Sequence, residues 1–175
     1  MRQLQRLVAI ALVPATLFAQ AAKAPAISEA AIVGIFDAAN GWDIATGTLA
    51  STKASRGEVR DFGTMLAQVH TSVQQQARVL AGKLGVTPTP VARDFPLARD
   101  YAATMKKLGG LSGVAFDRAF LEHEVAYHKA VIDAVTKQFL PAITTPDLKA
   151  FVEKVAPAFD AHMRAAQTLL DKLPK

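Results

Sequence analysis

Residues 59–84 read VRDFGTMLAQVHTSVQQQARVLAGKL, and this stretch decides the fold because its apolar side chains recur at alternating steps of three and four residues. The recurring positions are Val59, Phe62, Leu66, Val69, Val73, Ala77, Leu80 and Leu84. Such spacing places them on one face of an α-helix, the face that packs against other helices. Residues 56–84 are therefore predicted to form one long amphipathic helix.

A second helix, predicted over residues 146–172, repeats this spacing near the end of the chain. Its recurring positions are Leu148, Val152, Val155, Phe159, His162, Ala166, Leu169 and Leu173. His162 is the one polar residue in this otherwise apolar stripe, so its side chain is expected to point into the core. Pro157 is expected to bend the helix, because its ring clashes with the preceding turn and removes one backbone hydrogen bond.

Two further long helices are predicted over residues 28–54 and 112–138. Ser28 is a candidate N-cap for the first of them, and Asp43 lies on or beside its inner stripe. The other has two neighbouring faces that are both apolar enough to be buried, so the pattern does not fix which one faces inward. Asp117, close to its start, is expected to support that end through the helix dipole.

The connections between these segments predict how the helices are arranged. Ser55-Arg56-Gly57 and the stretch from Pro141 to Pro146 are both short, so each is expected to join two antiparallel neighbours. Prolines at 88, 90 and 96 instead mark a long crossover that carries a short helix at residues 97–108. Two hairpins joined by a crossover predict an all-α fold, a ferritin-like antiparallel four-helix bundle over residues 28–173.

The first residues have the pattern of a secretory signal peptide. Arg2 and Arg6 precede an apolar run over residues 7–18, and Ala19-Gln20-Ala21 matches a small-residue cleavage site. We expect removal of residues 1–21, with cleavage as late as residue 24 as the alternative. The apolar run is much shorter than the roughly 20 residues that a membrane span needs. The mature chain is therefore expected to have no transmembrane span and to lie in the periplasm or outer envelope, where an envelope protein could be its partner.

The composition narrows the classes of function. The chain has no Cys, which rules out disulfides, thiolate metal ligands and lipid attachment through a cysteine. The formal net charge of +5 arises from 20 Lys and Arg against 15 Asp and Glu, and Arg2 and Arg6 would leave with the signal peptide. The remaining basic residues form no cluster, whereas nucleic-acid binding calls for a concentrated basic stripe. Nucleic acid is therefore not an expected partner.

The residues that could carry chemistry gather at one level of the predicted bundle. His70, His128 and His162 lie near the midpoints of three long helices, and Asp43 lies near the midpoint of the fourth. Because a helix rises about 1.5 Å per residue, mid-helix residues of equally long packed helices lie at the same height. If all four side chains face inward, they could hold one Zn²⁺, Cu²⁺ or Fe²⁺. Glu124, one turn before His128, could add a second carboxylate.

Two other interpretations stay open. The same side chains could form a buried polar network that only fixes which helix faces which, in a purely structural or interaction module. A metalloenzyme is the third interpretation, and it would need an open coordination position. The chain lacks the Glu-x-x-His motif of dinuclear iron bundles, since its nearest pair, Glu124 and His128, is spaced by four. No catalytic residue is assigned, and a non-enzymatic role is favoured.

Three segments carry a resemblance to a known family. They are FGTMLAQVH at residues 62–70, LSGVAFDRAF at residues 111–120 with His128 downstream, and APAFDAH at residues 156–162. With these segments the chain resembles a bacterial family of exported ferritin-like proteins of unknown function, whose members are often labelled outer-membrane proteins. The resemblance implies a ferritin-like bundle in the periplasm or outer envelope, and it brings no established activity.

This chain departs from that family pattern at two positions. Members tend to carry an Asp-His pair where this chain has Val69-His70, and a Glu where it has Asp43. The role of the first acid is therefore lost. The aspartate side chain is one methylene shorter than glutamate, so its carboxylate has a shorter reach toward the histidines.

Overall fold

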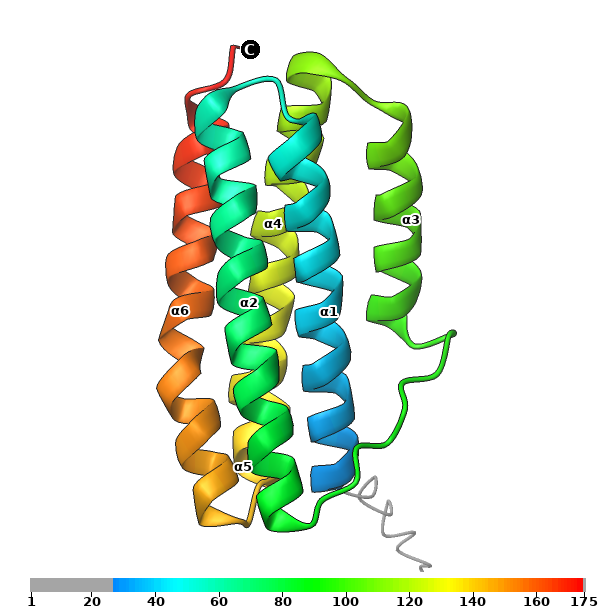
Figure 1. Ribbon diagram of the computed structural model, residues 1–175, viewed down its shortest axis with the longest axis vertical. Coiled ribbons are helices and arrows are strands. Elements are labelled where there is room, and N and C mark those ends of the chain that lie inside the picture. Colours follow the sequence, from blue (N-terminus) through cyan, green and yellow to red (C-terminus); the bar gives the residue numbers. More distant parts are fainter. Residues whose placement is uncertain (1–26, 175) are drawn as a thin grey trace, which may run out of the picture.

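The computed structural model describes residues 27–174, and every regular element in this range is helical (Figure 1). Four long helices lie side by side, namely α1 (Glu29–Lys53), α2 (Gly57–Leu84), α4 (Gly113–Ala134) and α6 (Pro146–Asp171). The predicted all-helical class is confirmed. The predicted signal peptide at residues 1–21 lies outside the described residues. Among the helices that are described, none combines the length and the apolar character needed to cross a membrane.

The chain order of the helices follows from two hairpins and one crossover. α1 packs chiefly against α2, and α4 packs chiefly against α6. Between these pairs the chain returns along the bundle through α3 (Pro96–Gly110), which lies outside the four long helices against α1 and α4 (Figure 1). As a result α2 and α4 run in one direction and α1 and α6 in the other (Figure 1). The two predicted hairpins are α1 with α2 and α4 with α6, and α3 is the predicted crossover helix.

The core consists of two apolar clusters with a polar layer between them. One cluster includes Ile32, Phe36, Val73, Val152 and Phe159, and the other includes Ala50, Leu66, Phe116, Phe120 and Ala166. Along α1, the buried Asn40, Asp43 and Thr46 lie between the residues that belong to the two clusters. Apolar side chains therefore close the polar layer from both ends of the bundle.

The third long helix continues beyond its predicted end at residue 138. A π-helical turn, η1 (Val135–Phe139), and a short helix, α5 (Leu140–Ala142), extend it. Pro141 has no N–H, and its ring would clash with the carbonyl four residues back in a regular helix. Ahead of it, the Leu140 N–H donates to the Val135 carbonyl, five residues back, which widens the helix before the proline. The predicted tight connection therefore begins after residue 142.

Of two predictions about helix starts, the one for α1 is confirmed and the one for α4 is wrong. Ser28 caps the helix as predicted, since its hydroxyl accepts from the Ala31 N–H at 3.2 Å. Asp117 lies beyond the first turn of α4, and its hydrogen bonds go to another segment. Its carboxylate accepts from the Ser55 N–H at 2.8 Å, the Ser55 hydroxyl at 2.6 Å and the Arg56 N–H at 3.0 Å. Asp117 on α4 therefore holds the turn between α1 and α2.

Candidate metal centre

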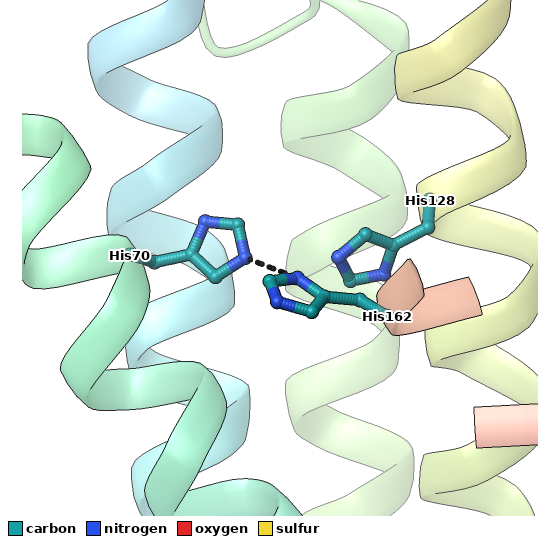
Figure 2. Close-up of side chains that lie close together, drawn as sticks. All are labelled: His70, His128 and His162. Atoms are coloured by element: carbon teal, nitrogen blue, oxygen red, sulfur yellow. Dashed lines mark hydrogen bonds between the residues drawn. The ribbon is translucent and has the colours of Figure 1, made fainter. Parts of the chain in front are cut away.

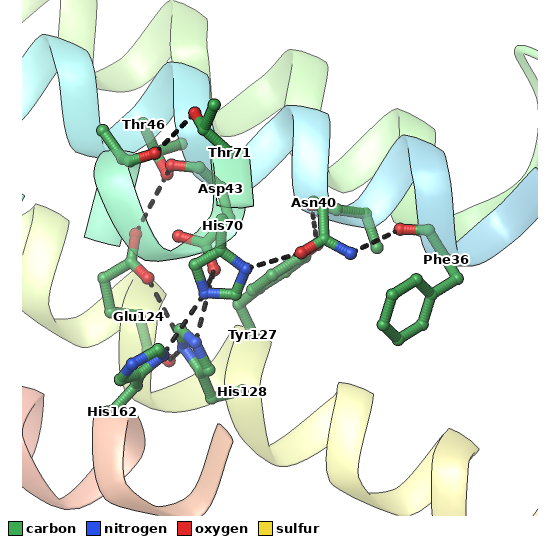
Figure 3. A network of polar contacts seen from close by, with 12 residues as sticks. Phe36, Asn40, Asp43, Thr46, His70, Thr71, Glu124, Tyr127, His128 and His162 are labelled. Atoms are coloured by element: carbon green, nitrogen blue, oxygen red, sulfur yellow. Dashed lines mark hydrogen bonds and ion pairs between the residues drawn. The ribbon is translucent and has the colours of Figure 1, made fainter. Parts of the chain in front are cut away.

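The four predicted ligand residues meet at the middle of the bundle, one from each long helix. Asp43 comes from α1, His70 from α2, His128 from α4 and His162 from α6. Their exposed fractions are 1%, 3%, 1% and 7%, so all four are buried. Figure 2 shows the three imidazole rings turned toward one another, and Figure 3 shows Asp43 above them in the same polar network. The inward orientation predicted for His162 is found, and the condition that Asp43, His70 and His128 also face inward is met.

Short distances join the potential ligand atoms. Asp43 Oδ2 lies 2.9 Å from His70 Nε2 and 3.3 Å from His128 Nε2. His70 Nε2 lies 3.3 Å from His162 Nδ1 (Figure 2). Ligands about 2.0–2.1 Å from a tetrahedral Zn²⁺ lie about 3.3 Å from one another. Ligand atoms of His70, His128 and His162 lie within 4.8 Å of one another, and so do those of Asp43, Glu124 and His128. Each set of three therefore has the spacing to hold one small ion.

Asn40 fixes the tautomer of His70. The Asn40 Nδ2 group donates to the Phe36 carbonyl at 2.7 Å, so the Asn40 Oδ1 atom faces His70 Nδ1, at 2.9 Å. An amide oxygen can only accept, and His70 Nδ1 therefore carries the ring hydrogen. In the neutral ring this leaves a lone pair on Nε2, the atom that faces Asp43 and His162. A bond of this kind to the far nitrogen is how metal-ligating histidines are commonly oriented.

The Glu124 backbone fixes the tautomer of His128 in the same way. His128 Nδ1 lies 3.0 Å from the Glu124 carbonyl oxygen, which can only accept. His128 Nε2 therefore also presents a lone pair, and it is directed toward Asp43. Burial lowers the pKa of His128, with a smaller opposing effect from Asp43. The neutral imidazole that can bind a metal is therefore the favoured form.

Several buried polar atoms of the centre have no hydrogen-bond partner. Burial acts to raise the pKa of Asp43, but the neighbouring His70 and His128 outweigh it and the pKa is lowered, so Asp43 is a carboxylate. The His128 lone pair faces this anion at 3.3 Å, whereas His70 Nε2 also lies 3.3 Å from His162 Nδ1. Four buried atoms of the described residues have no hydrogen-bond partner, namely Asp43 Oδ1, Asp43 Oδ2, Glu124 Oε2 and His128 Nε2. A cation would attract both the Asp43 carboxylate and the His128 lone pair, and an ion that prefers N and O ligands fits them.

The remaining groups of the layer differ in protonation. Burial, followed by the nearby His128 and His70, lowers the pKa of His162 to about 4, so this ring is also neutral near pH 7. Burial and the charge of Asp43 raise the pKa of Glu124 well above its ordinary value. Thr46 donates its hydroxyl to Glu124 Oε1 at 3.1 Å. Glu124 Oε2 lies 3.4 Å from His128 Nδ1, so Glu124 lies beside the histidine as predicted.

Asp43 reaches the histidines because α1 and α2 approach each other very closely. Gly47 on α1 and Gly63 on α2 face each other at the contact, and neither has room for a Cβ atom. Gly47 lies one turn after Asp43, and Gly63 lies two turns before His70. The aspartate side chain is therefore long enough to reach the histidines, since Asp43 Oδ2 comes within 2.9 Å of His70 Nε2.

Two residues of the centre, Asn40 and Tyr127, were not singled out as functional by the sequence reasoning. Asn40 lies three residues before Asp43, on the same side of α1, and this spacing is a signal that could have indicated it. The Tyr127 hydroxyl donates to the Ala39 carbonyl at 2.7 Å, and its ring meets that of His128 edge-on, with 5.8 Å between centroids. His123, the remaining histidine, lies outside the cluster with Nδ1 3.3 Å from Thr104 Oγ1.

The fold and site define a helical bundle with a buried cluster of histidines and carboxylates. A sequence profile described as Domain of unknown function (DUF4142) matches residues 14–169. The chain belongs to this family. No curated protein and no solved structure matches the chain significantly. The cluster could hold a metal ion or act as a polar network, and the family does not decide between these roles.

Proposed function

We propose that this protein is a non-enzymatic, exported helix-bundle protein of the cell envelope that binds one transition-metal ion. Asp43, His70, His128 and His162 are the proposed ligands, with Glu124 as an additional carboxylate beside His128. The observation that carries the proposal is the set of buried atoms of Asp43 and His128 that have no hydrogen-bond partner. The fixed tautomer of His128 directs a lone pair at the Asp43 carboxylate, and a cation between them would give both groups a partner.

The chemistry of the donor set favours a borderline transition metal. Three imidazole nitrogens and one carboxylate oxygen suit Zn²⁺, Cu²⁺ or Fe²⁺, whereas Mg²⁺ and Ca²⁺ prefer oxygen ligands. A neutral imidazole set with one carboxylate also leaves a divalent ion with a net charge of one in the core. A role in the envelope, including a response to metal or oxidative stress, is consistent with such a site.

The bundle itself is proposed to be ferritin-like. Its support is the single long crossover, which leaves α2 and α4 running in the same direction, as in folds that have one such connection (Figure 1).

Export is proposed from the pattern of residues 1–21. The mass of the mature protein, isolated from the envelope fraction of a bacterial host, tests it. A chain that begins at residue 22 or 25 supports export, and a full-length chain in the cytosol contradicts it.

Thermal unfolding of the metal-stripped chain with added Zn²⁺, Cu²⁺ or Fe²⁺ tests the metal site. A ligand at 100 times its Kd adds about 2.7 kcal/mol of stability. For a domain of this length that raises the Tm by about 5–10 °C. We expect this shift in the native protein and not in His162→Ala.

His123→Ala is the matched control, because it removes the histidine outside the cluster and should keep the metal-induced shift. If no metal shifts the native Tm, and His162→Ala loses only the stability of an ordinary core substitution, the metal proposal fails. The histidines then act as a polar network in a structural or interaction module.

A further inference from the structure

Two cavities meet at Tyr127, one inside the bundle and one outside it. The inner cavity has a volume of about 20 Å³, and its wall includes Asp43, His70 and His128. The outer hollow has a volume of about 310 Å³ and lies between α3 and α4. Tyr127 lines both of them. A molecule in the outer hollow is therefore separated from the metal centre by one side chain.

The inner cavity has the size and lining of a site for one small molecule. About 10–15 Å³ is enough for one water-sized occupant. Three of the four proposed metal ligands form one side, while Phe36, Val131 and Phe159 contribute apolar surface elsewhere. His162 does not line the cavity, so the ligands surround the ion unevenly and leave this side to an outside molecule. The occupant would gain its polar contact from the metal and apolar contact from the opposite wall.

Tyr127 closes the seam between α1 and α4. The direct contact between these two helices is much smaller than that within either hairpin. The Tyr127 hydroxyl bridges them by donating to the Ala39 carbonyl at 2.7 Å, and the ring lies between His123 and His128. Because helical carbonyls already accept a bond within the helix, this extra bond can break without leaving the Ala39 oxygen unpaired.

We propose that the metal centre keeps one coordination side open to a small exogenous lone-pair donor that enters the inner cavity with one water-sized end. This molecule reaches the inner cavity from the outer hollow past Tyr127, which acts as a gate. The inference rests on the proposed metal site and extends it. It assigns a ligand class to the site and a positioning role to Tyr127.

Azide binding to the Co²⁺-loaded protein tests the open side, because an added ligand changes the visible spectrum of Co²⁺. Val131→Phe fills the inner cavity with a large side chain. Ala39→Val is a second cavity-filling variant that adds a smaller side chain. Ile132→Phe is the matched control, since Ile132 is partly buried in the same apolar cluster but does not line the cavity. We expect saturable azide binding in the native protein and in Ile132→Phe. In Val131→Phe the Kd for azide should rise at least about tenfold, with one Co²⁺ still bound.

The gate is tested by stopped-flow mixing of the same Co²⁺ protein with azide. Loss of a hydrogen bond worth about 1 kcal/mol corresponds to a rate change of about fivefold. Tyr127→Phe should therefore speed azide association and dissociation by about this factor and leave the Kd nearly unchanged. Equal rates in Tyr127→Phe and the native protein would overturn the gating role.

The outcomes separate this inference from the proposed function. Bound Co²⁺ with no azide response, or an equal azide Kd in the native protein and both cavity-filling variants, overturns the open side and leaves the metal site intact. A chain that takes up no Co²⁺ at all overturns the metal site, and the inference fails with it.

Discussion

Gly47 and Gly63 meet face to face where α1 packs on α2. A Cβ atom on either glycine would lie 2.7 Å from the carbonyl oxygen of the other. Helix backbones can come this close only where side chains are missing. The contact lies between the Asp43 level and the Asp117-bound turn, and it sets how near α1 comes to α2 at the metal centre.

Gly63→Ala should therefore weaken both the fold and the metal site. The added methyl group would also meet the Ala50 Cβ at 2.8 Å, so the helices must move apart. Overpacking of this kind costs about 1–3 kcal/mol. Gly82→Ala is the matched control on the same helix, because nothing lies within 4 Å of its added Cβ. Urea unfolding should show a loss for Gly63→Ala and a gain of up to about 1 kcal/mol for Gly82→Ala. Equal stability in the two variants would contradict the close-contact explanation.

The sequence alone predicted the four long helices and the inward orientation of His162. The stripe through Val59, Phe62 and Leu66 determines one face of α2, and His162 could be placed because it interrupts such a stripe. The height of the cluster along the bundle axis follows from the lengths of the helices, and this height does not depend on exactly how they pack. Periodicity is a property of single helices, and it is sufficient for these features.

Contacts between helices were the part that the sequence could not predict. Asp117 binds a turn that is about 60 residues away in the chain, at Ser55 and Arg56, and only the packing of α4 beside that turn reveals it. The bond from His70 to Asn40 depends on the rotation of both helices about their axes. The π-helical turn before Pro141 depends on where the next helix must begin. Each of these features belongs to a pair of elements, and a single-helix pattern carries no signal for it.

Asn40→Ala should reduce metal affinity more than it reduces stability. The variant removes the acceptor that holds His70 Nδ1 and so frees the ring to rotate. Loss of such a supporting bond typically lowers metal affinity about 10- to 100-fold. Competition with a Zn²⁺ chelator measures it. Gln74→Ala is the control, since it removes another bond between α2 and α1, at 2.8 Å to the Asp37 carbonyl, away from the histidines. An equal affinity loss in both variants would mean that Asn40 has no special role.

Asp117→Ala should lower stability without changing metal affinity. Three hydrogen bonds to the turn between α1 and α2 are lost, and bonds to a charged acceptor contribute about 1.5–3 kcal/mol each. Non-additivity within one group makes a total of about 3 kcal/mol the expectation. Urea unfolding and Zn²⁺ titration measure the two effects, with the exposed Asp61→Ala as the control. A weakened Zn²⁺ site in folded Asp117→Ala would show that this turn and the centre are coupled.

Glu29 should make a small contribution to stability that disappears in acid. Its carboxylate accepts from the N–H and hydroxyl groups of Thr144 and Thr145, and the Thr145 bonds lower its pKa from 4.5 to about 2. Because the pKa is depressed in the folded state, the stabilisation is complete above 4.5 and is lost as the pH falls through about 2. Glu29 is solvated, so the size is at most about 1 kcal/mol.

Urea midpoints of the native protein and Glu29→Gln between about pH 6 and pH 2 check this pH dependence. The gap between the two proteins should be largest at the upper end of this range and close toward the lower end. A gap of constant size across the range would mean that hydrogen-bond geometry, and not the charge of Glu29, is responsible.

Native mass spectrometry of the metal-stripped chain titrated with Zn²⁺ tests the central claim most directly, because it counts ions on each folded chain. The comparison is between the native protein, the Asp43→Asn/His128→Gln variant and His123→Gln, which keeps the cluster intact. The proposed centre predicts one retained Zn²⁺ in the native protein and in His123→Gln, and none in the double variant. A native chain that stays metal-free, or a double variant that retains Zn²⁺ as well as the native chain does, would contradict it.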